Sequence, residues 1–431
     1  MRAMKDSGIE WIGEIPQGWG VERLKYHALF NPQTILPDYS DEDQVTFIPM
    51  DSLKSGFHLN TVSSFGKVKK GYVSFAENDV LMAKVTPCLE NGNLAIATNL
   101  LNGVGFGSTE INVIRCHDIK TQYLFYLLQC PSYIEKATFS MFGVAGLKRL
   151  EPEFLPNSFF PIPSQEEQAK ISDYLDTKCA EIDALIAAKE KTNALLKERR
   201  QSIIYETVTK GLDPTVPMKD SGVEWIGEIP EGWEIAALKR LGTPATGSTP
   251  SKDNPDYWDG NIPWVSSKDM KSDYLLDSED HITQAAVDEC GLTLFNPGTL
   301  IFCVRSGILR HTFPVAVATL PVTINQDLRA LSLTGDVNPA FLLYYMRGMN
   351  DTIVTLYQKI GATVESIEMD WFLYFPVVLP AREEQDRIVE ALDSRCASLD
   401  QTVKQNETTI KKLKEYRQSL IYEAVTGKIE V

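Results

Sequence analysis

The sequence has no apolar run long enough to cross a membrane. None of its hydrophobic stretches approaches the roughly 20 residues that a transmembrane helix needs, and the N-terminal segment MRAMKDSGIE lacks the apolar core of a signal peptide. Cysteine is sparse: seven cysteines are scattered over 431 residues without a CxxC pair. Such an odd, dispersed set argues against a disulfide framework and a zinc knuckle. These absences predict a globular cytoplasmic protein with no membrane partner. The length of 431 residues, with 43% hydrophobic residues, predicts two or more domains.

Recognisable catalytic motifs are also missing. The sequence contains no GxxxxGK[ST] phosphate loop, and it lacks the adenine-methylating pattern of Asn or Asp, two prolines and an aromatic residue. The five histidines form no HxxxH pair, which favours ordinary surface or core positions over metal ligands. The glycine-rich GVGFG at 103–107 is followed by no suitably spaced acidic residue, and we predict that it forms a turn. We therefore expect no catalytic residue and no metal site, and we predict that the chain is not itself an enzyme.

Basic residues are outnumbered by acidic ones. Lys and Arg total 42 against 58 Asp and Glu, so the formal net charge is −16. An acidic excess weighs against a nucleic-acid partner, because neutralising phosphates usually requires a basic surface. Net charge nevertheless governs solubility and long-range steering, whereas a binding groove needs only a local basic cluster. If the protein binds DNA, we expect another subunit to supply part of the positive field.

Internal repetition is the strongest pattern that is present. MKDSGIEWIGEIPQGW at 4–19 returns at 218–233 as MKDSGVEWIGEIPEGW, identical at 14 of 16 positions. A longer block that starts at Pro163 aligns without a gap with a block that starts at Pro380. The chain is therefore two tandem halves, each with a short box, a variable region and a long block. The variable regions show little resemblance to one another.

Each long block predicts a helix with coiled-coil periodicity. Pro163 and Pro380 stand just ahead of acidic residues, which favour the first turn of a helix. Apolar residues then follow a heptad over four repeats. The seam positions of the first block are Leu175, Cys179, Ile182, Ile186, Lys189, Asn193, Leu196, Arg200 and Ile203. Those of the second block are Leu392, Cys396, Leu399, Val403, Asn406, Ile410, Leu413, Arg417 and Leu420.

These two helices are expected to pair with each other. About 40 residues at 1.5 Å each make a rod of about 60 Å, and its apolar seam needs a partner. Because both copies belong to one chain, the simplest partner for each helix is the other. The polar seam residues Lys189, Asn193 and Asn406 cost stability in a zipper but can fix the register between two particular helices.

The ends of the two long blocks are nearly identical. ERRQSIIYETVT and EYRQSLIYEAVT place Arg200 and Tyr205 at positions matched by Arg417 and Tyr422. Packing within one chain tolerates drift at exposed positions, so the repetition favours an external contact. We predict that these four residues bind partner subunits, and a purely structural spine is the alternative.

The box aromatics have a different expected role. Trp11 and Trp19, with their copies Trp225 and Trp233, are predicted to cap the helix ends and join the halves rather than touch DNA. Buried aromatic rings carry much of a packing interface, which is the reason for this expectation.

The variable regions predict α+β modules that carry basic clusters. Short β-rich runs such as NDVLMAKV, EINVIRC, GTLIFCV and LRALSL alternate with Gly, Pro, Asn and Asp. A helical stretch, QYLFYLLQC or PAFLLYYMRGM, follows in each region. Lys and Arg grip phosphates, and Arg also reads guanine edges. The candidate DNA-binding residues are Lys67, Lys69, Lys70, Lys84, Lys148, Arg149, Lys252, Lys268, Arg305 and Arg310. For any single one of them, solvated surface is the alternative.

The layout as a whole resembles the specificity subunit of type I restriction-modification systems. The resemblance rests on the box, on PxxxEEQxxI leading into a helix that ends in RQSIIYE, and on NDVLMAKVTPCLENGN with GSTE and PGTLIFCVRSG with INQDLRAL. It implies two target recognition domains separated by two long helices that form an antiparallel coiled coil, in a pseudo-twofold internal repeat. It also implies a non-catalytic reader of double-stranded DNA, in which each recognition domain reads one half of a bipartite asymmetric target.

The same resemblance implies the partners and the cofactors. Modification (methyltransferase) subunits, expected to be two, dock to the helices, and restriction subunits join them to make the nuclease. S-adenosylmethionine, ATP and Mg²⁺ are expected on those partners, and none on this chain. The expected segments are a box at 1–20, recognition domains at 21–160 and 235–377, long helices at 161–211 and 378–428, and a linker with the second box at 212–234.

Two other classes of protein stay open at the level of sequence. One is a coiled-coil scaffold or RNA-binding protein, whose acidic surface repels duplex DNA. The other is a stand-alone nuclease or methyltransferase with degenerate motifs. Competition between duplex DNA and structured RNA, and turnover in the absence of partner subunits, discriminate among the three.

Overall fold

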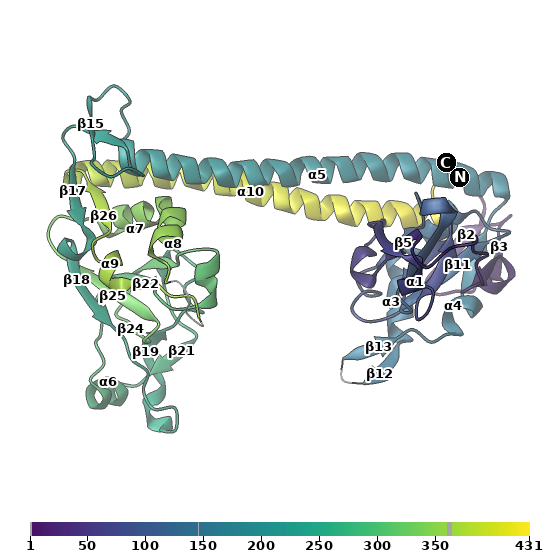
Figure 1. Cartoon of the computed structure of the whole chain (residues 1–431), viewed down its shortest axis with the longest axis horizontal. Helices are drawn as coiled ribbons and strands as arrows, with labels where there is room; N and C mark the ends of the chain where they lie inside the picture. Colours follow the sequence, from purple (N-terminus) through teal and green to yellow (C-terminus); the bar gives the residue numbers. More distant parts are fainter. Residues whose placement is uncertain (1, 145, 360–363) are drawn as a thin grey trace. The chain divides into compact units, whose positions relative to one another are not determined.

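A computed structural model describes residues 2–144, 146–359 and 364–431. The chain divides into two compact units (Figure 1): the first unit is Met1–Glu190 with Glu407–Val431, and the second unit is Lys191–Asn406. Both long helices pass from one unit into the other, so each unit contains a segment of each helix.

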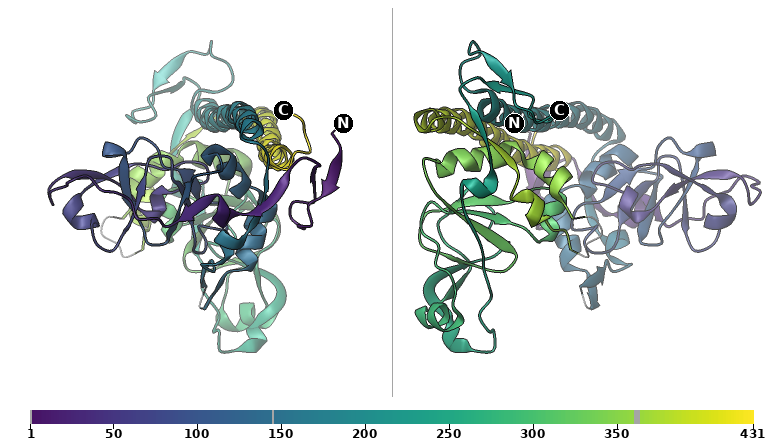
Figure 2. Two further views of the ribbon diagram at one scale, coloured as in Figure 1. Left: turned by 90° about the vertical axis from the view of Figure 1, so that its right-hand side faces the viewer. Right: turned by 60° about the vertical axis from the view of Figure 1, so that its left-hand side comes forward.

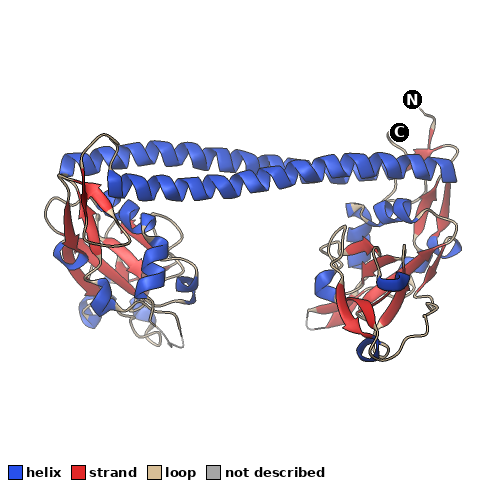
Figure 3. Ribbon diagram, turned by 45° about the horizontal axis from the view of Figure 1, so that its top comes forward, coloured by secondary structure: helices blue, strands red, loops and turns tan. Residues whose placement is uncertain are grey.

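The first unit is a set of small sheets with a few short helices (Figure 3). Its main sheets have the orders β6-β5-β10-β7 and β4-β11-β8-β9, and β14 pairs with β3. Its strands are β1 (Met4–Asp6), β2 (Glu14–Pro16), β3 (Gly20–Arg23), β4 (Ala28–Phe30), β5 (Gln44–Ile48), β6 (Thr61–Ser64), β7 (Val73–Ala76), β8 (Val80–Ala83), β9 (Leu94–Ile96), β10 (Val104–Gly107), β11 (Ile111–Cys116), β12 (Phe142–Val144), β13 (Leu147–Arg149) and β14 (Phe159–Ile162). Its short helices are α1 (Phe65–Val68), α2 (Thr121–Leu128), α3 (Pro131–Phe139) and α4 (Phe154–Asn157).

The second unit repeats this plan with different details. Its sheets have the orders β18-β25-β22-β23-β20 and β21-β19-β24, and β17 pairs with β26. Its strands are β15 (Met218–Asp220), β16 (Glu228–Pro230), β17 (Glu234–Ala237), β18 (Gly242–Thr246), β19 (Trp258–Val265), β20 (Tyr274–Leu275), β21 (Asp280–Ile282), β22 (Leu300–Cys303), β23 (Val315–Ala318), β24 (Thr323–Ile324), β25 (Leu328–Leu333) and β26 (Pro376–Leu379). Its short helices are α6 (Gln284–Cys290), α7 (Pro339–Gly348), α8 (Asn350–Tyr357) and α9 (Met369–Phe372).

Each unit contains its own framework sheet, and the two sheets have the same strand arrangement. This confirms the predicted pair of α+β modules. β4-β11-β8-β9 in the first unit corresponds to β18-β25-β22-β23 in the second. The central strands β8 (VLMA) and β22 (LIFC) are buried at every residue, and α2 and α7 pack against β9 and β23. A buried strand needs only apolar side chains of suitable volume. The two halves therefore keep the same sheet although their variable regions show little sequence resemblance.

The prediction of a turn at GVGFG is wrong, because this segment contains strand β10. β10 pairs in parallel with β5 and antiparallel with β7. A Cβ atom at Gly105 would lie 2.3 Å from Cε2 of Phe75, so only glycine lets that aromatic ring pack across the strand. The glycines were visible in the sequence, whereas the ring that requires them comes from another strand.

The two long helices follow the predicted heptads. α5 (Gln165–Lys210) and α10 (Arg382–Val425) are 46 and 44 residues long, and each has two glutamates in its first turn. Every predicted seam residue of both helices is buried or half-buried. The seam is therefore confirmed by the burial pattern.

Within each unit, the segments of α5 and α10 lie side by side and run antiparallel (Figure 2). In the first unit, Nε of Arg417 lies 3.0 Å from Oδ1 of Asp183, and Nζ of Lys414 lies 3.7 Å from Oε1 of Glu190. The residue numbers of the α10 partners decrease as those of α5 increase, so the two segments run antiparallel.

The second unit holds the polar pair of the seam. Nδ2 of Asn406 donates a hydrogen bond of 2.8 Å to Oδ1 of Asn193, and both side chains are buried. A buried amide pair that is satisfied only in one alignment disfavours slipped registers. Nε of Arg200 lies 3.2 Å from Oδ1 of Asp400, which again sets the antiparallel direction.

Each box sits where one long helix begins and the other ends. In the first unit, Nε1 of Trp19 donates to Oε1 of Glu167 at 3.4 Å, and the hydroxyl of Tyr422 donates to the carbonyl of Ile12 at 2.9 Å. Glu167 lies in the first turn of α5, whereas Tyr422 lies near the end of α10. Trp11, Ile12 and Trp19 are buried in the core of this unit.

The second box repeats this arrangement with the helices exchanged. Nε1 of Trp233 donates to Oε2 of Glu384 at 3.0 Å, and the hydroxyl of Tyr205 donates to the carbonyl of Trp225 at 3.0 Å. Trp233 is buried, and Trp225 is half-buried with its ring stacked on Phe375. The predicted packing role of the box aromatics is thus confirmed.

Candidate nucleic-acid interface

The ten predicted basic residues all lie in the globular parts of the two units, outside the long helices. Nine of them are exposed and Lys84 is half-buried. What distinguishes them is the neighbourhood of each charge, which the sequence does not show.

In the first unit, one group of basic residues gathers at the hairpin β12–β13. Figure 1 shows this hairpin projecting from the body of the unit. It is anchored by backbone bonds to the segment after β8: the N–H of Thr86 donates to the carbonyl of Lys148 at 3.0 Å, and that of Leu150 donates to the carbonyl of Lys84 at 2.8 Å. Lys84 and Arg149 line a cavity of about 380 Å³ beside Glu110. The structure therefore brings Lys84, Lys148 and Arg149 together.

The shape of the hairpin depends on one glycine. Gly143 has a φ of +155°, and a Cβ there would lie 2.1 Å from the carbonyl oxygen of Leu147 on the paired strand. All residues of β12 and β13 are exposed, including the apolar Phe142, Val144 and Leu147. A two-stranded ribbon of this size fits the major groove of DNA.

The other three lysines of the first unit lie on a different sheet. Lys67, Lys69 and Lys70 belong to α1 or directly follow it, and α1 packs on β5 and β6. Nζ of Lys69 lies 2.5 Å from Oδ1 of Asp41. The α1 lysines form a second basic group. Its supporting strands, β5 and β6, belong to a different sheet from the hairpin strands β12 and β13.

In the second unit, two arginines meet near residues 365 and 366. Nε of Arg310 donates to Oε1 of Glu365 at 2.9 Å. Arg305 forms a β-bridge with Ser366, and its Nε lies 3.3 Å from Oδ1 of Asp327. Hydrogen bonding to Arg310 lowers the pKa of the Glu365 carboxyl, so that group stays ionised at neutral pH. The remaining candidate, Lys252, lies in the loop before β19.

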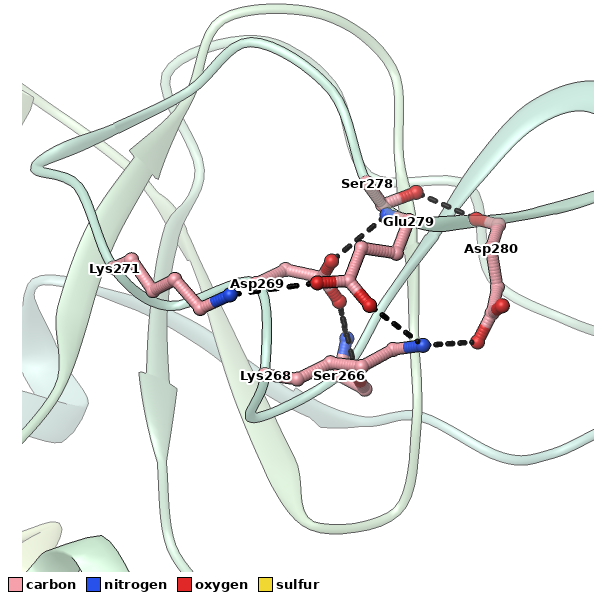
Figure 4. A network of polar contacts seen from close by, with 7 residues as sticks. All are labelled: Ser266, Lys268, Asp269, Lys271, Ser278, Glu279 and Asp280. Atoms are coloured by element: carbon pink, nitrogen blue, oxygen red, sulfur yellow. Dashed lines mark hydrogen bonds and ion pairs between the residues drawn. The ribbon is translucent and has the colours of Figure 1, made fainter. Parts of the chain in front are cut away.

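Lys268 occupies an acidic network instead of an open basic surface (Figure 4). Its Nζ lies 2.9 Å from Oδ2 of Asp280 and 3.2 Å from Oε2 of Glu279, and Lys271 shares Glu279. Asp269 accepts from the N–H groups of Ser266 and Glu279 at 2.8 Å each. With two lysines and three carboxylates, this network carries a net negative charge and is a poor place for a phosphate. A DNA contact by Lys268 stays a prediction.

The sequence reasoning missed the carboxylates that hold the arginines. Glu110, Asp327 and Glu365 are the partners of Arg149, Arg305 and Arg310. Each lies more than twenty positions from its arginine along the chain, and Arg149 is 39 positions from Glu110. The only local signal was the acidic residue that ends GSTE and INQD, directly before a strand.

The four predicted docking residues make matched contacts inside the chain. Tyr205 and Tyr422 each donate to a box carbonyl, and Arg200 and Arg417 each pair with an aspartate of the facing helix. These contacts explain why the four residues are repeated without invoking a partner. Their role in docking stays a prediction.

No group of three or more His, Cys, Asp or Glu side chains in the described part of the chain is placed to hold a metal ion. Among residues 2–144, 146–359 and 364–431, no helix combines the length and the apolarity that a membrane span requires.

Comparison with protein families finds one match in each half. The model described as "Type I restriction modification DNA specificity domain" matches residues 32–197 and 230–415. The type I restriction enzyme EcoEI specificity subunit of Escherichia coli is 37% identical over 163 residues, which are 37% of this chain and 27% of that protein. The chain thus spans about a quarter of the length of the first curated relatives that it matches.

Other relatives and solved structures match over more of the chain. The EcoR124I/EcoR124II specificity subunit of Escherichia coli is 28% identical over 65% of each chain. A chain from a study of complex assembly and conformational transition of the type I R-M system has a TM-score of 0.76 at 17% identity, covering 96% of this chain and 99% of that one. The HsdS subunit from Thermoanaerobacter tengcongensis has a TM-score of 0.54 at 18% identity, covering 96% and 98%. At these identities the two structures indicate a shared fold.

Proposed function

The chain belongs to the family of the type I restriction modification DNA specificity domain, and from this premise we propose that it is the non-catalytic, sequence-reading subunit of a type I restriction-modification complex. Each recognition domain reads one half of a bipartite asymmetric target in double-stranded DNA. One observation carries this proposal: two units share a framework sheet and a box but present different basic side chains. Two domains with the same framework sheet and different basic side chains can bind two half-sites of different sequence.

The proposal includes partners and cofactors. Two modification subunits dock to the long helices, and restriction subunits join the complex in the cytoplasm. S-adenosylmethionine, ATP and Mg²⁺ bind to these partners. The partners also supply part of the positive field that a chain of net charge −16 lacks. The recognition domains are proposed at 21–160 and 235–377, the long helical segments at 161–211 and 378–428, and the boxes at 1–20 and within 212–234.

Methylation mapping tests the proposed function directly. The chain is co-expressed with its modification subunits in cells that lack other methyltransferases, and the methylated adenines are mapped across the genome. Cells with the modification subunits alone are the control. A split motif that appears only with this chain is the expected result. Methylation without the chain, or a motif without a spacer, would overturn the proposal.

The alternatives gain no support from the described part of the chain. A scaffold or RNA-binding protein has no need of two domains that have the same framework sheet but present different basic side chains. A stand-alone enzyme would methylate or cleave DNA without partners. Adding S-adenosylmethionine and Mg²⁺ to the purified chain with DNA is expected to give no turnover.

The docking role of the repeated tail gives a second prediction. Arg200→Ala with Tyr205→Phe removes one ion pair between half-buried Arg200 and exposed Asp400, worth about 1 kcal/mol, and one hydrogen bond, worth about 0.5–1.5 kcal/mol, so the fold survives. If these side chains also contact a modification subunit, its affinity falls by about tenfold or more, the effect of losing one hot-spot contact. Co-purification and titration by calorimetry measure the loss.

The matched control for this variant is Asp400→Ala. It breaks the ion pair with Arg200 from the opposite helix but leaves Arg200 and Tyr205 in place. Normal docking of the control with weak docking of the double variant supports the external role. Wild-type docking of both variants would assign Arg200 and Tyr205 to internal packing alone.

A further inference from the structure

Each recognition domain holds one carboxylate at the same place in its framework sheet. Glu110 directly precedes β11, and Asp327 directly precedes β25. The N–H of Glu110 donates to the hydroxyl of Ser108 at 3.1 Å, and the N–H of Asp327 donates to the side-chain oxygen of Asn325 at 3.1 Å. The same tight turn therefore sets both carboxylates.

The backbones of these two residues are fixed to the neighbouring central strand. The carbonyl of Glu110 accepts from the N–H of Lys84 at 3.0 Å, just after β8. The carbonyl of Asp327 accepts from the N–H of Val304 at 2.9 Å, just after β22. The two carboxylates thus occupy corresponding positions at the ends of buried strands, which are rigid supports.

Both carboxylates hold an arginine, but the arginines come from different elements. Arg149 lies on the hairpin strand β13, and its Nε donates to Oε2 of Glu110 at 2.9 Å. Arg305 lies in the segment after β22, and its Nε lies 3.3 Å from Oδ1 of Asp327. The framework repeats the carboxylate, whereas the variable part supplies the guanidinium.

In both pairs the carboxylate is shielded and the arginine is exposed. The side chains of Glu110 and Asp327 are 26% and 23% exposed, whereas those of Arg149 and Arg305 are 55% and 61% exposed. In the ion pair between Lys69 and Asp41 the exposures are reversed, because the carboxylate of Asp41 is more exposed than the lysine. Each carboxylate therefore pairs with an arginine whose side chain is more than half exposed, through hydrogen bonds in Arg149 and through an ion pair in Arg305.

The free part of the guanidinium has the chemistry of a base reader. Arg149 directs Nε and Nη2 at Glu110, and within residues 2–144, 146–359 and 364–431 its Nη1 makes no hydrogen bond. Arginine forks that are held in advance lose less side-chain entropy on binding. In the major groove such a fork matches the O6 and N7 acceptors of guanine, the commonest specific arginine contact.

We propose that Arg149 and Arg305 each read a guanine in the half-site of their own domain, and that Glu110 and Asp327 are positioning residues that orient them. This inference rests on the proposed function. Because the guanidinium approaches the shared carboxylate from β13 in one domain and from the segment after β22 in the other, the two domains present it differently. A carboxylate at the same position of the framework sheet, paired with an arginine from a different element in each domain, allows the two domains to read unlike half-sites.

The test uses the co-expressed complex and compares four single variants by methylation mapping. Glu110→Gln and Arg149→Lys keep the size of the side chain but remove the charge or the planar fork. We expect each of them to make one guanine position degenerate in one half-site, with the preference for guanine falling by about 5- to 150-fold. Asp327→Asn and Arg305→Lys are expected to do the same in the other half-site only.

Glu151→Gln is the matched control. It removes the same charge two positions from Arg149, at an exposed side chain for which the described part of the chain shows no polar partner. We expect its half-site preferences to be unchanged. Equal degeneracy in Glu151→Gln and Glu110→Gln would overturn the positioning role, because it would reflect the change in net charge alone.

Salt dependence separates base reading from phosphate contact. Loss of a phosphate contact weakens all sequences alike and reduces the slope of log K against log salt by about 1. The variant for this measurement is Arg149→Gln, which removes the positive charge. We expect its slope to be unchanged, with full preference retained at the second half-site. A reduced slope with intact guanine preference would overturn the inference.

Failure of this inference can be distinguished from failure of the proposed function. If the wild-type complex methylates no split motif, the proposed function fails. If the wild-type complex does so and all four variants keep full guanine preference, only the inference fails. Arg149→Lys and Arg305→Lys change exposed side chains, so the test does not depend on the folding of the carboxylate variants.

Discussion

Duplicating one heptad in both long helices is expected to lengthen the spacer of the methylated motif by about three base pairs. The duplicated segments are 183–189 in α5 and 410–416 in α10, which face each other in the first unit. Seven residues add about 10.5 Å of helix at 1.5 Å each, and one base pair spans about 3.4 Å. A heptad also preserves the seam, because the seam repeats every 3.5 residues.

The choice of segments keeps both register contacts. After the duplication, Asp183 still faces Arg417, and Asn193 still faces Asn406. The half-site sequences are expected to stay as they are, because the recognition domains are untouched. Methylation at the original spacing is expected to fall by about two orders of magnitude or more, since several base pairs of one half-site are lost at about 1–3 kcal/mol each.

Methylation at the new spacing is expected to be weaker than in the wild type. Three base pairs rotate B-DNA by about 100°, since one turn takes about 10–10.5 base pairs, and the added heptad does not turn the second recognition domain to match. Genome-wide mapping measures both spacings in one experiment. An unchanged spacer with unchanged half-sites would show that the helices do not set the separation.

A duplication in α5 alone is the control. Seven unmatched residues force the loss of either the Asn193–Asn406 bond or the Arg417–Asp183 pair, so the helices cannot keep both registers. We expect this variant to be less stable and to methylate neither spacing well. Normal activity of the α5 variant at a single new spacing would contradict the paired-helix account.

The sequence predicts well those structural features that are periodic or that occur twice. The seam of α5 and α10 follows from a heptad that a helix buries on one side, and β8 and β22 follow from short apolar runs. The box aromatics were assigned to packing because large rings are stabilised by burial. These features depend on neighbours a few residues apart or on a pattern that occurs twice.

Features that depend on distant neighbours could not be predicted. The glycines of β10 looked like a turn because Phe75, whose ring requires them, lies on another strand. The hairpin β12–β13 is exposed on both faces, so it has no apolar alternation to mark it as strand. Arg149 was predicted, whereas its anchor Glu110 was not, because the fold alone brings them together.

The internal contacts of the repeated tail were missed for the same reason. The heptad places Arg200 and Arg417 in the seam, but it does not show which residue of the facing helix lies opposite each of them. Arg417 and Asp183 are far apart in the sequence and meet only because α5 and α10 are antiparallel in the first unit. Repetition of a residue therefore indicates a repeated contact, but it does not say whether the contact is internal or external.

Replacing Trp19 of the first box is expected to cause the largest loss of stability. Trp19 is 2% exposed and belongs to the core of the first unit, beside the end of α10. Trp19→Ala removes a whole buried indole, which costs about 3–5 kcal/mol in a core that relaxes only partly. Packing there is tight, because a Cβ at Gly427 would already lie 2.9 Å from Cη2 of Trp19. Urea unfolding followed by circular dichroism of the helices measures the loss.

Two further variants separate packing from the hydrogen bond and from the position in the chain. Trp19→Phe keeps most of the apolar surface but removes the N–H that donates to Glu167, so we expect a loss of about 1–3 kcal/mol. Trp233→Ala removes the equivalent ring, which is 3% exposed, from the core of the second unit. Each alanine variant is expected to destabilise mainly its own unit, because the two hydrophobic cores share no residue. Equal unfolding midpoints in Trp19→Ala and the wild type would mean that the box does not hold the helix ends, and the repeated frame would then need another explanation.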